Sequence, residues 1–168
     1  NREKKIDILV NNVGSVVKRT SFLNSNDKLW QSVLDLNLMS AVRTTRIALK
    51  LLMQSKHGVI VNISSVAART GGGGDSLHYS VAKAAINIFT KGLAKELKKI
   101  RVIGIAPSAI NTDFQKKYST KQRLRRIINE TPMGRIGSPE EIAEFIYFIS
   151  SSKTSFLSGE TIFITGGR

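Results

Sequence analysis

A tyrosine and a lysine one helical turn apart are the residues of this sequence best suited to acid–base chemistry. Tyr79 and Lys83 are four positions apart, so a helix would place both on one face. An ammonium group beside a phenol stabilises the phenolate, and we therefore expect Lys83 to lower the pKa of Tyr79 from its ordinary value of about 10. A phenol tuned in this way can serve as a general acid or base. The same spacing also arises among surface residues of a lysine-rich chain.

Two further polar residues could complete such a site. Ser65 follows an apolar run and precedes the loop that leads to Tyr79, so its hydroxyl could hold a substrate carbonyl or simply cap a turn. Asn37 falls inside an expected helix, where asparagine has poor propensity. It is either an exposed, helix-bending residue or a buried amide that holds a water molecule or a backbone group. A Ser-His-Asp triad is not expected, because the chain has no Gly-x-Ser-x-Gly elbow.

The elements that must position these residues alternate between strands and helices. Helical spacing of apolar residues, or a start signal, predicts helices over 27–54, 77–98 and 138–150, the last with a Ser138 N-cap and a capping-box Glu141. Short runs that are apolar on both faces predict strands over 6–10, 59–63, 101–106 and 160–164. This alternation indicates a doubly wound α/β fold with a parallel sheet covered on both faces.

Polar motifs follow three of the expected strands directly. In open parallel sheets the ligand lies beyond the carboxyl ends of the strands. The segments Asn11–Gly14, Ser64–Ser65 and Pro107–Thr112 all stand just after strand ends. We therefore expect them to meet at one edge of the sheet.

Composition bounds the class of protein. The 168 residues suffice for a single domain with a continuous core. The absence of cysteine excludes disulfide scaffolds and thiolate metal sites, and two histidines do not make a metal site convincing. No apolar run is long enough to span a bilayer, and no signal-peptide pattern follows Asn1, so we expect a cytoplasmic protein without a membrane segment. Because the first residue is not Met, we also expect that the chain is cut at its start.

The net charge of +14 is distributed unevenly. Residues 115–135 contain seven Lys or Arg and one Glu. This stretch is either a solvated surface or a surface for an anionic substrate or carrier. Nucleic-acid binding is not expected, because no basic stripe is interleaved with aromatic residues.

Taken in order, these motifs resemble the short-chain dehydrogenase/reductase family. The resemblance runs from about Ile6 to Gly167 and rests on six ordered motifs. They are Asn11-Asn12-Val13-Gly14, Asn37, Ser65, Tyr79-x-x-x-Lys83, Pro107-x-x-x-x-Thr112, and the closing text from Pro132 to Gly167.

The resemblance implies a Rossmann-type NAD(P)-dependent oxidoreductase that moves a hydride between nicotinamide and a carbonyl or alcohol carbon. It implies that Tyr79 is the acid or base, that Lys83 lowers its pKa, that Ser65 positions the carbonyl oxygen, and that Asn37 supports a proton relay through water. The cofactor, NAD or NADP, would then be bound by Asn11, Gly14, Tyr79, Lys83, Pro107, Ser108, Ile110 and Thr112.

Some features depart from the family pattern. The glycine-rich motif that cradles the pyrophosphate at a helix N-terminus, and the residue that selects NAD or NADP, are absent. The chain therefore resembles the C-terminal two-thirds of such a domain, without its first strands, and alone we expect it to bind cofactor poorly. Ser108 stands where the family usually has Gly, and the join from Leu97 to Arg101 is shorter than usual.

The resemblance also frames the substrate and the assembly. A small-molecule or carrier-bound carbonyl compound is the expected substrate, and the basic segment 115–135, a mobile lid in similar proteins, favours 3-oxoacyl-carrier reduction. A sugar, polyol or steroid dehydrogenase and a catalytically silent cofactor-binding scaffold are the alternatives. The resemblance implies subunit contacts through the helices over 27–54 and 77–98, hence a homotetramer first and a dimer second, with Ala41, Ala48, Phe89 and Leu93 as candidates for a second buried face.

Overall fold

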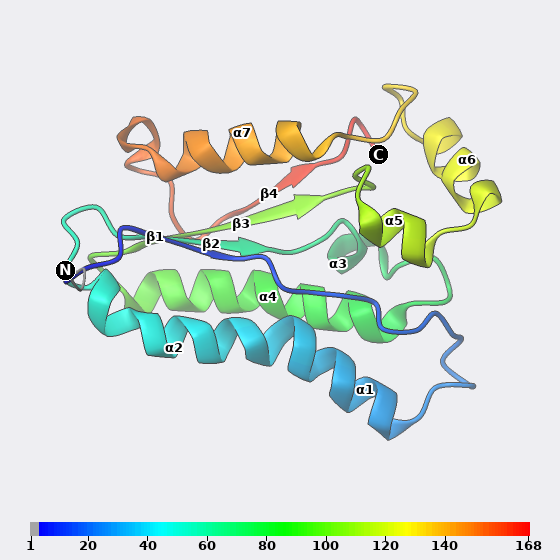
Figure 1. Ribbon diagram of the computed structural model, residues 1–168, viewed down its shortest axis with the longest axis horizontal. Coiled ribbons are helices and arrows are strands. Elements are labelled where there is room, and N and C mark those ends of the chain that lie inside the picture. The colour runs from blue at the N-terminus through cyan, green and yellow to red at the C-terminus, as the bar shows by residue number, and fades with distance from the viewer. Residues whose placement is uncertain (1–3) are drawn as a thin grey trace.

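A parallel sheet of four strands forms the middle layer of the structure, a computed structural model that describes residues 4–168. The strands are β1 (Ile8–Asn11), β2 (Val59–Ile63), β3 (Arg101–Pro107) and β4 (Thr161–Ile164). They lie in the order β1-β2-β3-β4, and every neighbouring pair is parallel (Figure 1). The four expected strands are thus confirmed, with shifts of one or two residues at some of their ends.

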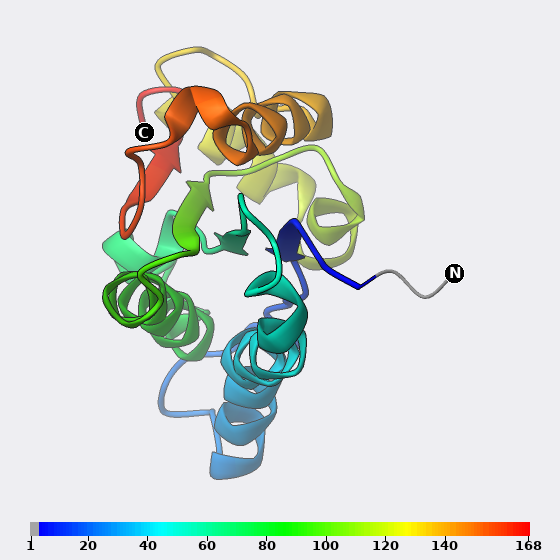
Figure 2. The same cartoon turned by 90° about the vertical axis from the view of Figure 1, so that its left-hand side faces the viewer.

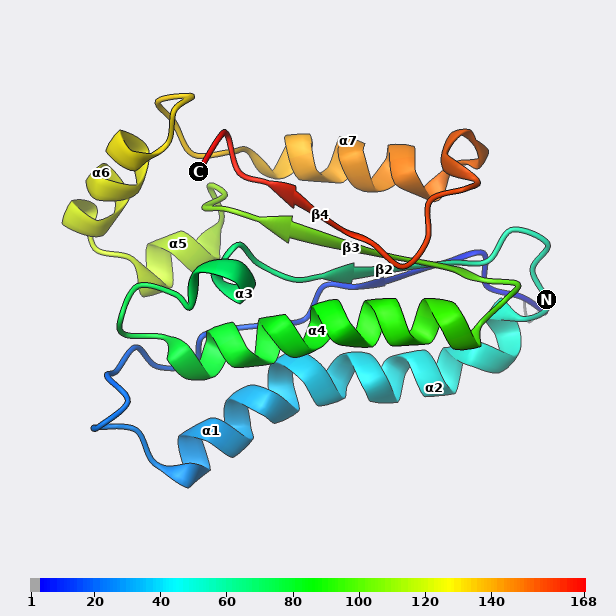
Figure 3. The same cartoon turned by 180° about the vertical axis from the view of Figure 1, so that it is seen from behind.

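Helices cover both faces of this sheet, as Figure 2 shows end-on. One face carries α1 (Asp27–Leu34), the π-helix η1 (Asp35–Met39), α2 (Ser40–Leu52) and α4 (Leu77–Glu96), whereas α7 (Pro139–Ser150) covers the other (Figure 3). The expected helix over 27–54 is therefore one continuous rod with a π-helical segment inside it. Shorter elements are α3 (Ala67–Thr70), α5 (Asp113–Tyr118), α6 (Lys121–Glu130) and the 3-10 turn η2 (Ser152–Thr154).

Alternating strand residues supply two separate halves of the core. Ile60 and Val102 pack with Ala48 and Leu52 of α2, whereas Val61 and Ile103 pack against Ile149 of α7. This division follows from the alternation of side chains along a strand, which sends neighbours to opposite faces.

The expected second buried face of α2 and α4 needs correction. Ala41 and Ala48 are buried within this chain, and Leu93 packs against the same core cluster as Ala48. The apolar side chains that do remain exposed on these helices include Ile47 on α2, 80% exposed, and Ile88 on α4, 72% exposed.

The start of α7 confirms the predicted capping box. Ser138 accepts a hydrogen bond from the Glu141 N–H, and the Glu141 carboxylate accepts one from the Ser138 N–H at 2.8 Å. In contrast, the segment 115–135, expected only as a mobile lid, contains most of α5 and all of α6. Figure 1 shows both of these helices beside the carboxyl ends of the strands.

Candidate active site

A cavity of about 670 Å³ lies at the carboxyl ends of the strands. Three of the segments that were predicted to meet contribute to its wall: the turn after β1, the turn after β2 and the turn after β3. Eight of the ten predicted site residues line it, namely Gly14, Ser65, Tyr79, Lys83, Pro107, Ser108, Ile110 and Thr112. Asn11 and Asn37 are not among its lining residues.

The ionisation of Tyr79 differs from the expectation. Burial raises the pKa of its phenol, while a side-chain hydrogen bond with Ser65 and the positive charge of Arg19 oppose that rise. Lys83 is not among the causes, so the predicted lowering by this lysine was wrong for the protein without cofactor. A phenol with a raised pKa is protonated at neutral pH and can act as a proton donor.

Lys83 is held by the backbone of β2. Its Nζ donates a hydrogen bond to the carbonyl of Ile63 at 2.8 Å and lies 5.7 Å from the centroid of the Tyr79 ring. The side chain is only 3% exposed, and burial lowers the pKa of its ammonium group to about 8. Lys83 is thus a buried residue of the cavity wall, next to the tyrosine ring.

Asn37 is the buried amide that was one of its two sequence interpretations. Its side chain accepts a hydrogen bond from the Ser15 N–H at 3.0 Å and donates to the carbonyls of Ser15 and Val33 at 2.8 and 2.9 Å. Asn37 lies in the π-helical stretch η1, whose backbone bonds span five residues instead of four. Asn37 therefore fixes the turn after β1.

Gly14 lies between Asn37 and Lys83. A Cβ atom at this position would come within 2.7 Å of Asn37 Oδ1 and within 2.8 Å of Lys83 Nζ. A Cβ atom essentially never lies this close to another heavy atom, so any residue other than glycine would force Asn37 or Lys83 to move.

Asn11 occupies a different place from the one implied by the resemblance. Its amide donates to Asn62 Oδ1 at 2.8 Å and to Thr45 Oγ1 at 3.0 Å, within the layer between the sheet and the helices. Its neighbour Asn12 lines the cavity instead. Side chains alternate along an extended strand end, so two adjacent asparagines cannot face the same way.

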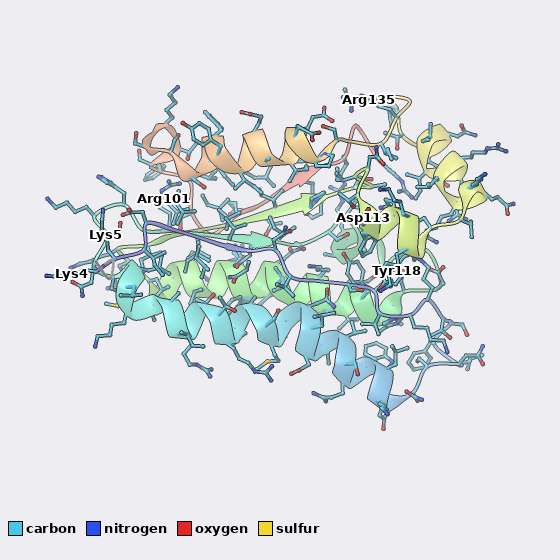
Figure 4. All side chains as sticks on the ribbon, viewed as in Figure 1. Lys4, Lys5, Arg101, Asp113, Tyr118 and Arg135 are labelled. Atoms are coloured by element: carbon cyan, nitrogen blue, oxygen red, sulfur yellow. The ribbon has the colours of Figure 1, made fainter. Side chains whose placement is uncertain are left out.

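Two features of the site had no clear sequence signal. The rings of Tyr79 and Phe114, which both line the cavity, stand 6.1 Å apart, and the ring of Tyr118 stands 5.1 Å from that of Phe114. Tyr118 also accepts a hydrogen bond from Ser15 Oγ at 2.8 Å. Figure 4 labels Asp113 and Tyr118 on α5, the helix that also carries Phe114.

Ser108 provides a test of whether a cofactor fits. Its hydroxyl oxygen is buried, lines the cavity and has no hydrogen-bond partner in the structure. A buried hydroxyl without a partner costs free energy, and a bound carboxamide or ribose would supply one. The residues present therefore fit a nicotinamide group at this edge. In the part of the chain that is described, no three potential metal ligands gather into a site, and no helix is long and apolar enough to cross a membrane.

The fold and this cavity define an α/β protein of the Rossmann type, with its polar site at the carboxyl edge of a parallel sheet. Residues 1–168 match the family described as enoyl-(acyl carrier protein) reductase. Together with the relatives below, this match shows that the chain belongs to the short-chain dehydrogenase/reductase family, as its motifs predicted.

Curated relatives include two 3-oxoacyl-[acyl-carrier-protein] reductases. The Escherichia coli protein is 34% identical over 165 residues, covering 97% of this chain and 66% of that protein. The Aquifex aeolicus protein is 40% identical over 166 residues, covering 96% of this chain and 65% of that protein. The chain thus spans about two thirds of the length of these relatives.

Solved structures give the same fold. A short-chain dehydrogenase/reductase from Brucella melitensis, described as a glucose/ribitol dehydrogenase, superposes with a TM-score of 0.90 at 33% identity, covering 97% of this chain and 65% of that one. A 3-oxoacyl-[acyl-carrier protein] reductase with bound NAD from the same organism gives a TM-score of 0.86 at 33% identity, covering 96% and 62%.

Proposed function

We propose that the full-length protein reduces a carbonyl group with NADH or NADPH as the hydride source. The observation that carries this proposal is the meeting of Ser65 and Tyr79 in one cavity, where burial keeps the phenol protonated. When bound, the reduced nicotinamide supplies the hydride. Gly14, Lys83, Ser108, Ile110 and Thr112 would hold it.

The roles of the side chains follow from their positions. The Ser65 hydroxyl holds the carbonyl oxygen of the substrate, and the Tyr79 hydroxyl gives that oxygen a proton as negative charge develops on it. The Lys83 ammonium group, 5.7 Å from the centroid of the Tyr79 ring, stabilises the phenolate that remains after the transfer. Asn37 holds the turn after β1 through its hydrogen bonds with Ser15 and Val33.

A 3-oxoacyl thioester on a carrier is the substrate that we propose first. Its support is the identity of the curated relatives, together with the basic helices α5 and α6 at the cavity. A sugar or polyol dehydrogenase is the second candidate, because one solved neighbour is described as a glucose/ribitol dehydrogenase.

The test is Tyr79→Phe in the full-length protein, which removes only the hydroxyl. We expect kcat for reduction of a 3-oxoacyl thioester to fall by about 10²- to 10⁴-fold, while cofactor affinity changes little. A panel that includes sugars and polyols identifies the preferred substrate. If Y79F turned over at the full rate, Tyr79 would not be the acid. If the wild-type protein bound cofactor but reduced no carbonyl compound, it would instead be a catalytically silent cofactor-binding scaffold.

The assembly is also part of this proposal. We propose a cytoplasmic homotetramer whose subunits meet through α2 and α4, supported by the exposed Ile47 and Ile88 on those helices. Sedimentation of the full-length protein at micromolar concentration tests it, and a monomer alone would contradict it.

A further inference from the structure

Four arginine side chains line the same cavity as Tyr79. They come from segments far apart in the sequence: Arg19 follows β1, Arg123 and Arg126 belong to α6, and Arg168 ends the chain. Only Arg123 and Arg126 fall in the basic segment recognised from the sequence. The fold therefore concentrates positive charge at the cavity beyond what that segment supplies.

Carboxylates compensate only part of this charge. Asp75 lies between Arg19 and Arg123, at 3.0 and 3.2 Å. Glu130 lies between Arg126 and Arg168, at 3.6 and 2.9 Å. Each carboxylate is thus shared by two guanidinium groups, and the trio of Arg19, Asp75 and Arg123 keeps a net charge of +1. A further lining carboxylate, Asp113, is already paired with Lys116 at 2.8 Å.

Of the four arginines, Arg123 has the least complete hydrogen bonding and charge compensation. Its side chain is 20% exposed, yet its Nε is buried without a hydrogen-bond partner. Its pKa is lowered by burial and by the charges of Arg19, Arg126 and Arg168, and Asp75 opposes this only in part. A buried donor without an acceptor is costly, and an anion would supply both the acceptor and the missing charge.

The glycine-rich loop before α4 makes room for this guanidinium. A Cβ atom on Gly73 would come within 2.9 and 3.1 Å of the two terminal nitrogens of Arg123. The side chain therefore rests on bare backbone at the cavity wall. This contact gives Gly73 a role that its sequence did not reveal.

We propose that Arg19 and Arg123, with Arg126 and Arg168 beside them, bind an anionic oxygen group of the substrate while its carbonyl lies at Ser65 and Tyr79. The guanidinium fork matches a carboxylate or phosphate in two parallel hydrogen bonds. Arg19 and Arg123 line the same cavity of about 670 Å³ as Ser65 and Tyr79, so one substrate can contact both groups of residues. The inference rests on the proposed reduction and narrows it to substrates with a carboxylate, or with a phosphate on a thioester arm.

Matched substrate pairs test the inference in the full-length protein. One pair is acetoacetyl phosphopantetheine and acetoacetyl pantetheine, which differ by the phosphate alone. The other is a series of oxo acids of increasing length and their methyl esters. The pair in which charge lowers KM identifies the source of the anion.

The variant is Arg123→Gln, and its matched control is Lys121→Gln, which removes the same charge from an exposed residue of the same helix that is not in the cavity wall. We expect R123Q to raise KM about tenfold or more for the charged member of one pair and less than about twofold for the neutral member, with kcat and cofactor affinity little changed. K121Q should leave both members as they are. Arg126→Gln, at a side chain that is 57% exposed, should act in the same direction if R123Q folds poorly.

Equal effects of R123Q on charged and neutral members in both pairs would overturn the inference. Binding of inorganic phosphate, measured by calorimetry, separates this outcome from a failure of the proposed reduction, because it needs no turnover. Phosphate that binds wild type and K121Q but not R123Q supports the anion site even if no carbonyl compound reacts. Phosphate that binds none of them, or binds R123Q equally well, overturns it.

Discussion

Lys83 donates its hydrogen bond to the carbonyl of Ile63 at 2.8 Å, not to the hydroxyl of the tyrosine one turn away. The ammonium group is thereby placed beneath the Tyr79 ring in a buried position, where its pKa falls to about 8. The cation that the motif provides is therefore partly neutralised near physiological pH. Its ionisation can be measured directly.

We predict that the ε-methylene signal of Lys83 titrates with a midpoint near pH 8 in NMR spectra of the protein without cofactor. Lys83→Met assigns the signal by removing it. A midpoint near the ordinary lysine value of about 10.4 would show that the side chain is solvated and that the bond to Ile63 is not maintained.

The same shift predicts a pH dependence of stability. The pKa of Lys83 is lower in the folded than in the unfolded chain, so between about pH 8 and 10.5 the unfolded chain binds more protons. The cost of burying this charge is therefore fully present below that window and disappears as pH rises through it. As pH rises through this window, urea unfolding should show the free energy of unfolding of wild type increasing relative to that of K83M, by up to about 3 kcal/mol. A constant difference between the two proteins would contradict this.

Gly14→Ala should damage the site without unfolding the protein. The new methyl group would push against Asn37 Oδ1 and Lys83 Nζ, and displacement of catalytic groups by about 1 Å can cost about 100-fold in rate. We expect kcat to fall by about 10- to 100-fold and the Lys83 titration to move.

Gly92→Ala is the matched control for that substitution. No atom lies within 4 Å of a Cβ at this position of α4, so the alanine should stabilise the helix by up to about 1 kcal/mol and leave kcat unchanged. If G14A were as active as G92A, the crowding at Gly14 would not matter for the reaction.

Arg101→Met should destabilise the fold far from the cavity. Arg101 lies at the opposite end of the molecule from α5 (Figure 4). Its guanidinium donates to the carbonyls of Ile149, Ser151 and Thr154 at 2.9 to 3.1 Å, which satisfies groups at the C-terminal end of α7. We expect a loss of about 2 kcal/mol in the free energy of unfolding, measured with urea. Lys153→Met, which removes a nearby exposed cation, should cost much less.

The ion pair at the start of α7 predicts that the protein loses stability at acid pH. The Arg135 guanidinium holds the Glu141 carboxylate by two bonds of 2.7 Å and, with the Ser138 N–H, lowers its pKa to about 2. This contribution is present above the ordinary value of 4.5 and is lost as pH falls toward 2. The stability difference between wild type and Glu141→Gln should therefore be largest above pH 5 and shrink toward pH 2. Arg135→Met should give a similar profile, and parallel curves for wild type and E141Q would contradict the assignment.

The main elements of the fold could be predicted because local patterns agree with the packing. The strand Val59–Ile63 is apolar on both sides and indeed lies between two layers of helices. The Ser138–Glu141 capping box could be predicted because both partners lie within one helical turn. In contrast, α5 has only six residues, and the three apolar residues of α6, Leu124, Ile127 and Ile128, lie among charged ones, so the sequence indicated only a basic segment.

The site was predictable in its membership but not in its electrostatics. Spacing places Tyr79 and Lys83 on one helix face, but only the fold brings the Ile63 carbonyl to the lysine. Arg19 lies in a polar stretch without a motif. In the fold it lines the cavity and pairs with Asp75, 56 positions later in the chain. Long-range contacts of this kind leave no local pattern.

The chain of amides that begins at Asn11 also determines how the sheet assembles. Asn11 donates to Asn62 on the neighbouring strand, and Asn62 donates in turn to Thr90 Oγ1 of α4 at 3.0 Å. A slip of β1 by one residue would turn Asn11 to the other face and remove its amide from Asn62 Oδ1; in one direction it would bring the apolar Val10 opposite Asn62. Each polar group stranded in this way costs about 1–3 kcal/mol. β1 pairs with β2 through only four residues, and its short apolar run alone would allow other registers. The hydrogen bonds among Asn11, Asn62 and Thr90 therefore select the native register.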